Sequence, residues 1–144
     1  MRGWVSVLHF DRTFEFEPHF LLPEYERIDL ADIPGTNGYC RFDTLGLIRQ
    51  RLAGRKQRGV TLIGRGSYHY ATFLLLSEIR EPFTLVLFDH HADMMESPDA
   101  DILSCGSWAL EALRRLPALR KVLLIGAAMD SVRQIPAECR GRVT

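Results

Sequence analysis

The sequence predicts an α/β fold with a mainly parallel sheet. From residue 43 onward, short apolar runs typical of strands alternate with segments whose apolar residues recur at helical spacing. Two of these runs, Leu85–Phe88 and Val122–Ile125, contain no polar residue, which is typical of strands buried on both faces. Because strands that alternate with helices form parallel βαβ units, we expect helices to cover both faces of the sheet.

The strands are predicted from apolar runs that turn residues interrupt. Val60–Ile63 is expected to be a short buried strand, and the turn Gly64-Arg65-Gly66 follows it. Phe83–Phe88 begins directly after Pro82 and ends at an aspartate. The four predicted strands are Trp4–Phe10, Val60–Ile63, Phe83–Phe88 and Lys121–Gly126.

The helices are predicted from apolar residues three or four positions apart and from the residues at their ends. Leu45, Ile48 and Leu52 have this spacing; Asp43 is a plausible N-cap, and Gly54 interrupts the pattern. Later in the chain, a mostly buried helix and a helix capped by a serine are expected. The predicted helices are Asp43 to Gly54, Tyr68 to Ile79, and Ser107 to Leu116, with a weaker one after Asp130.

The length of 144 residues predicts a single domain over residues 1–144 with a real hydrophobic core. Within it, residues 1–42 are less regular than the remainder. The sequence supplies only about four strands, which is few for a sheet of this kind. The last element stops at Thr144 without a clear partner. We therefore expect an incomplete fold, the amino-terminal part of a longer protein.

Charge and cysteine content exclude several classes of partner. Lys and Arg together number 18, as do Asp and Glu, so no net field favours nucleic acid or an anionic membrane. No stretch has the length of a bilayer span, and none has the pattern of a signal peptide. Cys40, Cys105 and Cys139 are odd in number and widely spaced, which is typical of reduced thiols. We expect a cytoplasmic protein that acts on a small molecule, with no nucleic-acid or membrane partner; a homo-oligomer is compatible with the sequence.

The most informative segment follows the predicted strand Phe83–Phe88. Asp89, His91 and Asp93 are potential metal ligands spaced two apart, and alternate side chains of an extended backbone share one face, so His90 is expected to point away. Open α/β sheets bind their ligands at the carboxyl ends of strands. Two carboxylates and one imidazole suit manganese, iron or zinc better than calcium. The alternative is a polar loop in which Asp89 caps a turn.

A glycine-rich turn lies between the strand Val60–Ile63 and the helix Tyr68–Ile79. The segment Gly64–His69 resembles a dinucleotide-binding loop, and Asp89, about twenty residues later, imitates its ribose-binding acid. His69 occupies the position of the third glycine, where an imidazole obstructs close packing of helix and strand. If this strand neighbours the one before Asp89, His69 becomes a fourth candidate metal ligand; otherwise it is a packed core residue.

These segments together resemble the arginase/agmatinase (ureohydrolase) superfamily, and they are most similar to its shorter, divergent arginase-like proteins. The resemblance covers roughly residues 60–128, and its specific parts are Gly64–His69 and Phe88–Met94. It implies a three-layer α/β/α fold with two manganese ions at the carboxyl edge of a parallel sheet. Two ions about 3.5–4 Å apart can together acidify one water, which then attacks an unreactive carbon.

The resemblance also implies a role for each candidate ligand. His69 would ligate one ion and His91 the other. Asp89 would bridge the two ions, and Asp93 would complete the shell of the first. The resemblance does not identify a catalytic acid or base in this chain.

The chain departs from the family in two places. The family has an Asp-x-Asp pair at the end of a later strand, whereas here Asp99 and Asp101 form such a pair only in a loop close behind the motif, and Asp130 stands alone. The family also has a Ser-Gly-Asn-x-His type segment that contacts the substrate. Here Trp108 takes about the position of its proton-shuttling histidine, and Cys105 precedes it as an expected buried thiol.

Three functions are compatible with these observations. The first is an arginase-like, metal-dependent hydrolase of a C–N bond of the guanidino or amide type, with its substrate unknown. The second is a non-catalytic metal-binding or interaction domain of the same fold, and the third is a nucleotide-binding α/β domain. For this chain we expect one weakly held manganese ion and no arginase activity, because a second ion lacks ligands.

Overall fold

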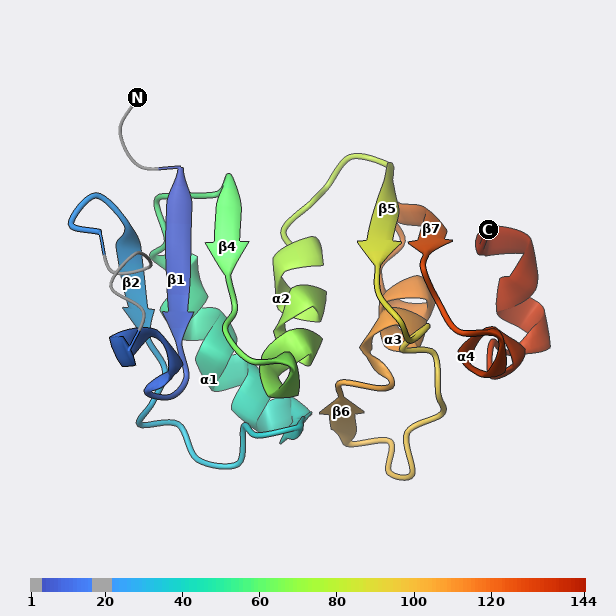
Figure 1. Ribbon diagram of the computed structural model, residues 1–144, viewed down its shortest axis with the longest axis horizontal. Coiled ribbons are helices and arrows are strands. Elements are labelled where there is room, and N and C mark those ends of the chain that lie inside the picture. The colour runs from blue at the N-terminus through green and yellow to red at the C-terminus, as the bar shows by residue number, and fades with distance from the viewer. Residues whose placement is uncertain (1–3, 17–21) are drawn as a thin grey trace. The chain divides into compact units, whose positions relative to one another are not determined.

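A computed structural model describes residues 4–16 and 22–144, and the chain divides into two compact units (Figure 1). The first unit is Met1–His69 and the second is Tyr70–Thr144. Both combine helices with parallel strands, so the predicted α/β class with mainly parallel pairing is confirmed. The three-layer arrangement and the single domain over residues 1–144 stay predictions.

The first unit contains a three-stranded parallel sheet with β1 in its centre. β1 is the central strand, and its polar residues Ser6 and His9 are buried. The Ser6 hydroxyl lies 3.1 Å from the Thr61 hydroxyl on the neighbouring strand. The strands, in the order in which they pair, are β2 (Glu26–Asp29), β1 (Val5–His9) and β4 (Val60–Leu62).

The helix of the first unit, α1 (Phe42–Ala53), follows the predicted pattern. Its buried residues are Leu45, Ile48 and Leu52, so the apolar spacing identified the face that packs. The N-cap residue is Arg41 and not Asp43, whose carboxylate accepts a hydrogen bond from the Thr44 amide inside the first turn. The other elements of this unit are η1 (Thr13–Phe16) and β3 (Tyr39–Arg41).

The second unit is built on a parallel pair of strands, β5 (Phe83–Phe88) and β7 (Leu119–Ile125), joined through α3 (Trp108–Arg115). Near the end of the chain, Val143 forms a parallel bridge with Val122 of β7. A short helical segment, η3, begins in the first unit and leads into α2. The remaining elements are η3 (Gly66–Ala71), α2 (Thr72–Leu76), β6 (Ile102–Ser104), α4 (Met129–Arg133) and η4 (Ala137–Arg142).

The core of the second unit forms around α3. Trp108 to Leu113 are six consecutive buried residues, so this helix is covered on all sides except at its last turn, where Arg114 and Arg115 lie. The helix α2 packs against it. The buried beginning of α3 contacts Asp93, because the amides of Ala109 and Leu110 donate to the Asp93 carbonyl.

Three predicted elements differ from the expectation in their length or in their burial. Val60 of β4 is exposed, so the strand predicted at Val60–Ile63 is shorter and less buried than expected. In place of a helix from Tyr68 to Ile79, a 3-10 segment leads into an α-helix that ends at Leu76. On β5, Phe88 is 75% exposed, so one face of this strand is not covered.

Three strands outside the prediction also form, β2, β3 and β6. β2 contains one buried residue, Ile28, among charged ones, and β3 and β6 have only three residues each. None of them makes an apolar run long enough to indicate a strand. Within residues 4–16 and 22–144, no helix has the length and hydrophobicity needed to cross a membrane.

Candidate metal centre

Asp89 is placed by the carboxyl end of β5. Its backbone amide donates to the carbonyl of Ile125, the last residue of β7, at 3.1 Å. β7 then turns at Gly126, whose φ of +88° is a left-handed conformation that favours glycine. The Asp89 side chain accepts a hydrogen bond from the His91 amide at 2.9 Å, so the chain turns directly after the strand.

Asp93 is held by the start of α3. Its φ is +52°, its residue is 8% exposed, and its backbone carbonyl accepts hydrogen bonds from the amides of Ala109 and Leu110 at 3.1 and 3.4 Å. The Trp108 indole N–H donates to the Asp93 carboxylate at 2.7 Å. Next to it, the Ala92 amide donates to the Ser131 hydroxyl at 2.5 Å. The short loop that carries Asp93 is therefore fixed from both sides.

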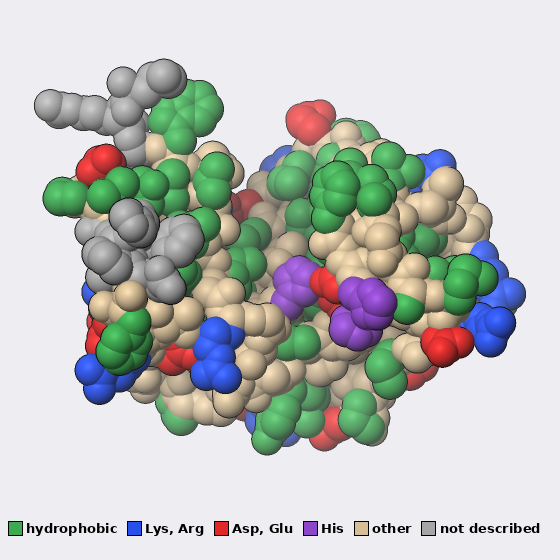
Figure 2. Space-filling model, in the orientation of Figure 1, with side chains coloured by type: hydrophobic (Ala, Val, Ile, Leu, Met, Phe, Trp, Pro, Cys, Tyr) green, Lys and Arg blue, Asp and Glu red, His purple; other side chains and the backbone are tan. Residues whose placement is uncertain are grey.

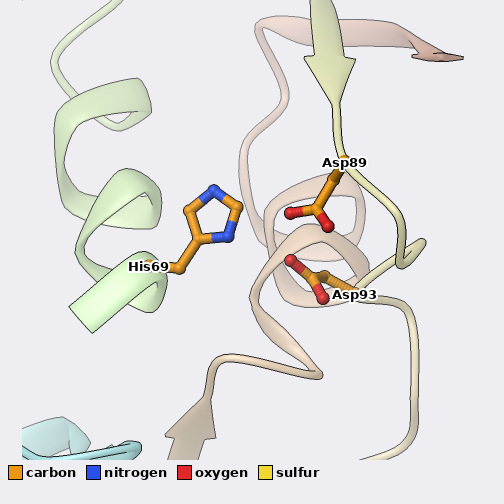
Figure 3. A group of neighbouring side chains, drawn as sticks. All are labelled: His69, Asp89 and Asp93. Atoms are coloured by element: carbon orange, nitrogen blue, oxygen red, sulfur yellow. The ribbon is translucent and has the colours of Figure 1, made fainter. Parts of the chain in front are cut away.

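His69 lies in η3 at the boundary between the units. One peptide bond joins it to Tyr70, which is fully buried, and η3 continues into α2, which packs against α3. The ligand atoms of His69, Asp89 and Asp93 all lie within 4.8 Å of one another (Figure 3). Ligands bound at about 2 Å from one ion lie within about 4 Å of each other, so a small movement would fit the three around a cation.

His91 is outside this group of three. Its side chain is 71% exposed, and its ring nitrogen Nδ1 lies 3.6 Å from Asp89 Oδ1. The expectation that Asp89, His91 and Asp93 share one face assumed an extended backbone. The turn at Asp89 and the left-handed conformation of Asp93 remove that alternation. Figure 2 shows the histidine side chains of this region beside acidic ones on the surface.

The glycine-rich turn anchors the first half of η3. Gly64 has a φ of +96°, and a Cβ there would lie 3.4 Å from the Phe14 ring. Tyr68 stacks on Phe10 with ring centroids 4.4 Å apart, and its hydroxyl donates to Asp11 at 3.0 Å. The residues after the turn thus pack onto the end of β1.

The electrostatics of that anchor follow from its hydrogen bonds. Burial acts to raise the pKa of Asp11, but the hydrogen bonds from Thr13 and Tyr68 outweigh it and hold the pKa below its ordinary value. Burial and the bond to Asp11 raise the pKa of the Tyr68 hydroxyl. The pair therefore stays in the carboxylate and phenol forms at neutral pH.

An ion pair fastens the loop that leaves the site. Arg114, at the end of α3, contacts Glu96 at 2.6 Å and Glu138 of η4 at 2.7 Å. Its hydrogen bonds lower the pKa values of both glutamates, and the two glutamates raise the pKa of Arg114. Residues 94–96 are thereby attached to the helix that holds Asp93.

The other acidic residues considered from the sequence stay outside the group. The Asp99 carboxylate accepts a hydrogen bond from the Asp101 amide in an exposed turn, and Asp130 forms an ion pair with Arg133 at 3.5 Å. Cys105 is half-buried, not buried as expected, and all three cysteines are free thiols. Sequence reasoning missed Ser131, and it gave no sign that Trp108 donates to a carboxylate fifteen residues earlier.

Comparison with known proteins gives one informative match. An uncharacterized protein of Thermotoga maritima is 41% identical over 68 residues, which make up 47% of this chain and 27% of that protein. The match therefore spans about a quarter of the relative's length. No family model matches the chain, and no solved structure matches it.

Proposed function

We propose that the chain binds one divalent transition-metal ion through His69, Asp89 and Asp93 and belongs to a metal-dependent hydrolase of C–N bonds of the ureohydrolase type. The observation that carries the proposal is the approach of these three ligand groups to within 4.8 Å. His69 comes from η3, whereas Asp89 and Asp93 come from the end of β5 and the loop between β5 and β6. Asp93 adds support, because strained backbone persists where the surroundings fix it, often at functional sites.

The donor set favours a particular class of ion. One imidazole nitrogen and two carboxylates suit manganese, iron or zinc, whereas calcium takes six to eight oxygen ligands. Three protein ligands leave coordination positions for water or substrate, which is typical of catalytic sites. Such an ion, when bound, lowers the pKa of a bound water and supplies a hydroxide near neutral pH. The side chains of the chain itself hold and orient the ion.

A non-catalytic metal-binding domain is the second candidate function. The exposure of His91 favours it, because the family arrangement uses that position to hold a second ion. A nucleotide-binding loop has less support. The α-helix after the glycine turn, α2, has five residues, and a phosphate-binding loop normally opens a longer helix.

Metal binding tests the proposal directly. Isothermal titration calorimetry of the metal-free protein with Mn²⁺ or Zn²⁺ is expected to give one bound ion per chain. Asp89→Asn and Asp93→Asn each remove a negative ligand and should abolish that binding, while Asp99→Asn, in the exposed turn, should leave it unchanged. Equal binding by wild type, Asp89→Asn and Asp93→Asn would refute the site. Release of product from a guanidino or amide compound, dependent on the metal and lost in Asp89→Asn, would separate the hydrolase from the non-catalytic domain.

A further inference from the structure

The buried indole of Trp108 contacts one of the proposed ligands from behind. Trp108 is fully buried at the first residue of α3, and its Nε1–H donates to Asp93 Oδ2 at 2.7 Å. We infer that Trp108 is a positioning residue of the metal centre, whose N–H holds the Asp93 carboxylate in the orientation that faces His69 and Asp89. This inference rests on the proposed metal function.

The backbone contacts of Asp93 do not determine the orientation of its carboxylate group. The backbone of Asp93 is already attached to α3 through the amides of Ala109 and Leu110. The terminal torsion of an aspartate is broad and has no strong staggered preference of its own. The directed Trp108 N–H on Oδ2 therefore restricts how the carboxylate is turned.

The chemistry of an indole suits this role. Its N–H donates but does not accept, and it carries no charge. It therefore orients the carboxylate without neutralising it, whereas an arginine or lysine would place a positive charge next to the cation. An indole also does not ligate the metal itself. Metal sites use such outer partners, and their loss typically weakens metal affinity by about 10–100-fold.

A purely structural role for the contact between Trp108 and Asp93 predicts a different result. A buried tryptophan N–H usually finds a partner whether or not a ligand binds nearby. In that case, loss of the N–H would lower the stability of the metal-free protein and leave metal affinity and coordination geometry unchanged. The two roles are therefore distinguished by metal binding and not by stability.

The first test compares Trp108→Phe with Trp4→Phe. The first variant keeps an aromatic ring in the core and removes the N–H, while the second removes the other tryptophan of the chain, which is 67% exposed. Zn²⁺ affinity should fall about 10–100-fold in Trp108→Phe and stay unchanged in Trp4→Phe. The visible absorption of bound Co²⁺, which reports ligand geometry, should change in Trp108→Phe at saturation. Unchanged affinity and an unchanged Co²⁺ spectrum would overturn the inference.

The second test uses the native side chain and so does not depend on folding of Trp108→Phe. The ¹⁵N-labelled protein has two indole N–H resonances, and Trp4→Phe assigns them. Saturation with diamagnetic Zn²⁺ should shift the Trp108 resonance and leave that of Trp4 in place. If calorimetry shows Zn²⁺ bound and the Trp108 resonance does not move, the positioning role is refuted while the metal site stands. If wild type binds no Zn²⁺ or Mn²⁺, the proposed function fails and this inference fails with it.

Discussion

Asp93 is the residue on which most constraints of the candidate site meet. A left-handed backbone costs a non-glycine residue about 1–2 kcal/mol, although aspartate tolerates it better than most. Here the carbonyl and the carboxylate of the same residue are both hydrogen-bonded to the start of α3. The folded chain thus fixes a conformation that an isolated loop would rarely adopt, and this conformation places the carboxylate near Asp89 and His69.

The two histidines predicted as metal ligands, His69 and His91, provide the sharpest test of single residues. His69 lies in the group of three and His91 outside it. We expect His69→Ala to weaken Mn²⁺ binding by more than the roughly 10–100-fold typical for loss of an outer partner, because a direct ligand is lost. His91→Ala should change the affinity little. Electron paramagnetic resonance of free Mn²⁺ measures both constants.

A loss of binding in both His69→Ala and His91→Ala would favour the ligand set that the family resemblance implies, in which both histidines ligate. A loss of binding in His91→Ala, with His69→Ala close to wild type, would contradict the group of His69, Asp89 and Asp93. Asp99→Asn serves as the control for unspecific binding to exposed carboxylates, since its side chain lies in an exposed turn.

At the scale of elements, strand β5 shows what the sequence determines well. Its bounds, Phe83–Phe88, agree with the prediction because Pro82 and Asp89 interrupt the apolar run on both sides. Its burial was predicted wrongly, because the pattern cannot show whether any helix covers a face. β2 was missed for a related reason: Ile28 is its one buried side chain.

The candidate site was predictable as far as local rules reach. Asp89 follows the carboxyl end of β5, and the His69 ligand atoms lie within 4.8 Å of those of Asp89 and Asp93. The reason for which His69 was added, that its strand neighbours the strand before Asp89, was wrong, because β4 pairs with β1 and β5 pairs with β7. The role of His91 depended on extended backbone beyond the strand, and a single Asx turn was enough to change it. The donation from Trp108 to Asp93 is a tertiary contact, and no spacing rule contains it.

Arg114 of the helix α3 leads to a prediction of how the stability of the protein depends on pH. Hydrogen bonds from Arg114 lower the pKa values of Glu96 and Glu138 below the ordinary 4.5. The stabilisation is therefore fully present above about pH 4.5, the value in the unfolded chain, and it is lost as the pH falls through the lower folded values. Arg114→Met, which keeps an apolar stem, should flatten this part of the stability profile. Urea unfolding between pH 3 and pH 7 measures it.

Salt and a second arginine control this experiment. The three side chains are partly exposed, so added salt should reduce the difference between wild type and Arg114→Met. Arg133→Met removes a similar charge from the exposed pair with Asp130 and should keep the wild-type profile. Parallel profiles of stability against pH for wild type and Arg114→Met would show that this network does not contribute to the pH dependence of stability.

At the scale of the whole molecule, the chain divides into two α/β units, and its positive and negative charges balance. The matched part of the Thermotoga maritima protein covers 27% of that protein. Catalytic activity is therefore a question separate from metal binding by these 144 residues. The proposed ligands His69, Asp89 and Asp93 would hold one ion.

The last prediction concerns catalysis by the 144-residue chain. We expect no urea release from arginine or agmatine, even with Mn²⁺ added, because the shared hydroxide of the resembled family requires two ions and the three ligand groups suffice for one. Trp108 also hydrogen-bonds Asp93 where the family resemblance has a proton-shuttling histidine, and such proton transfer contributes about 10²–10⁴-fold. A colorimetric urea assay with the purified chain, with and without Mn²⁺, measures this directly. Urea formation that needs Mn²⁺ and disappears in Asp89→Ala would contradict the prediction, because the three-ligand site would then suffice for hydrolysis.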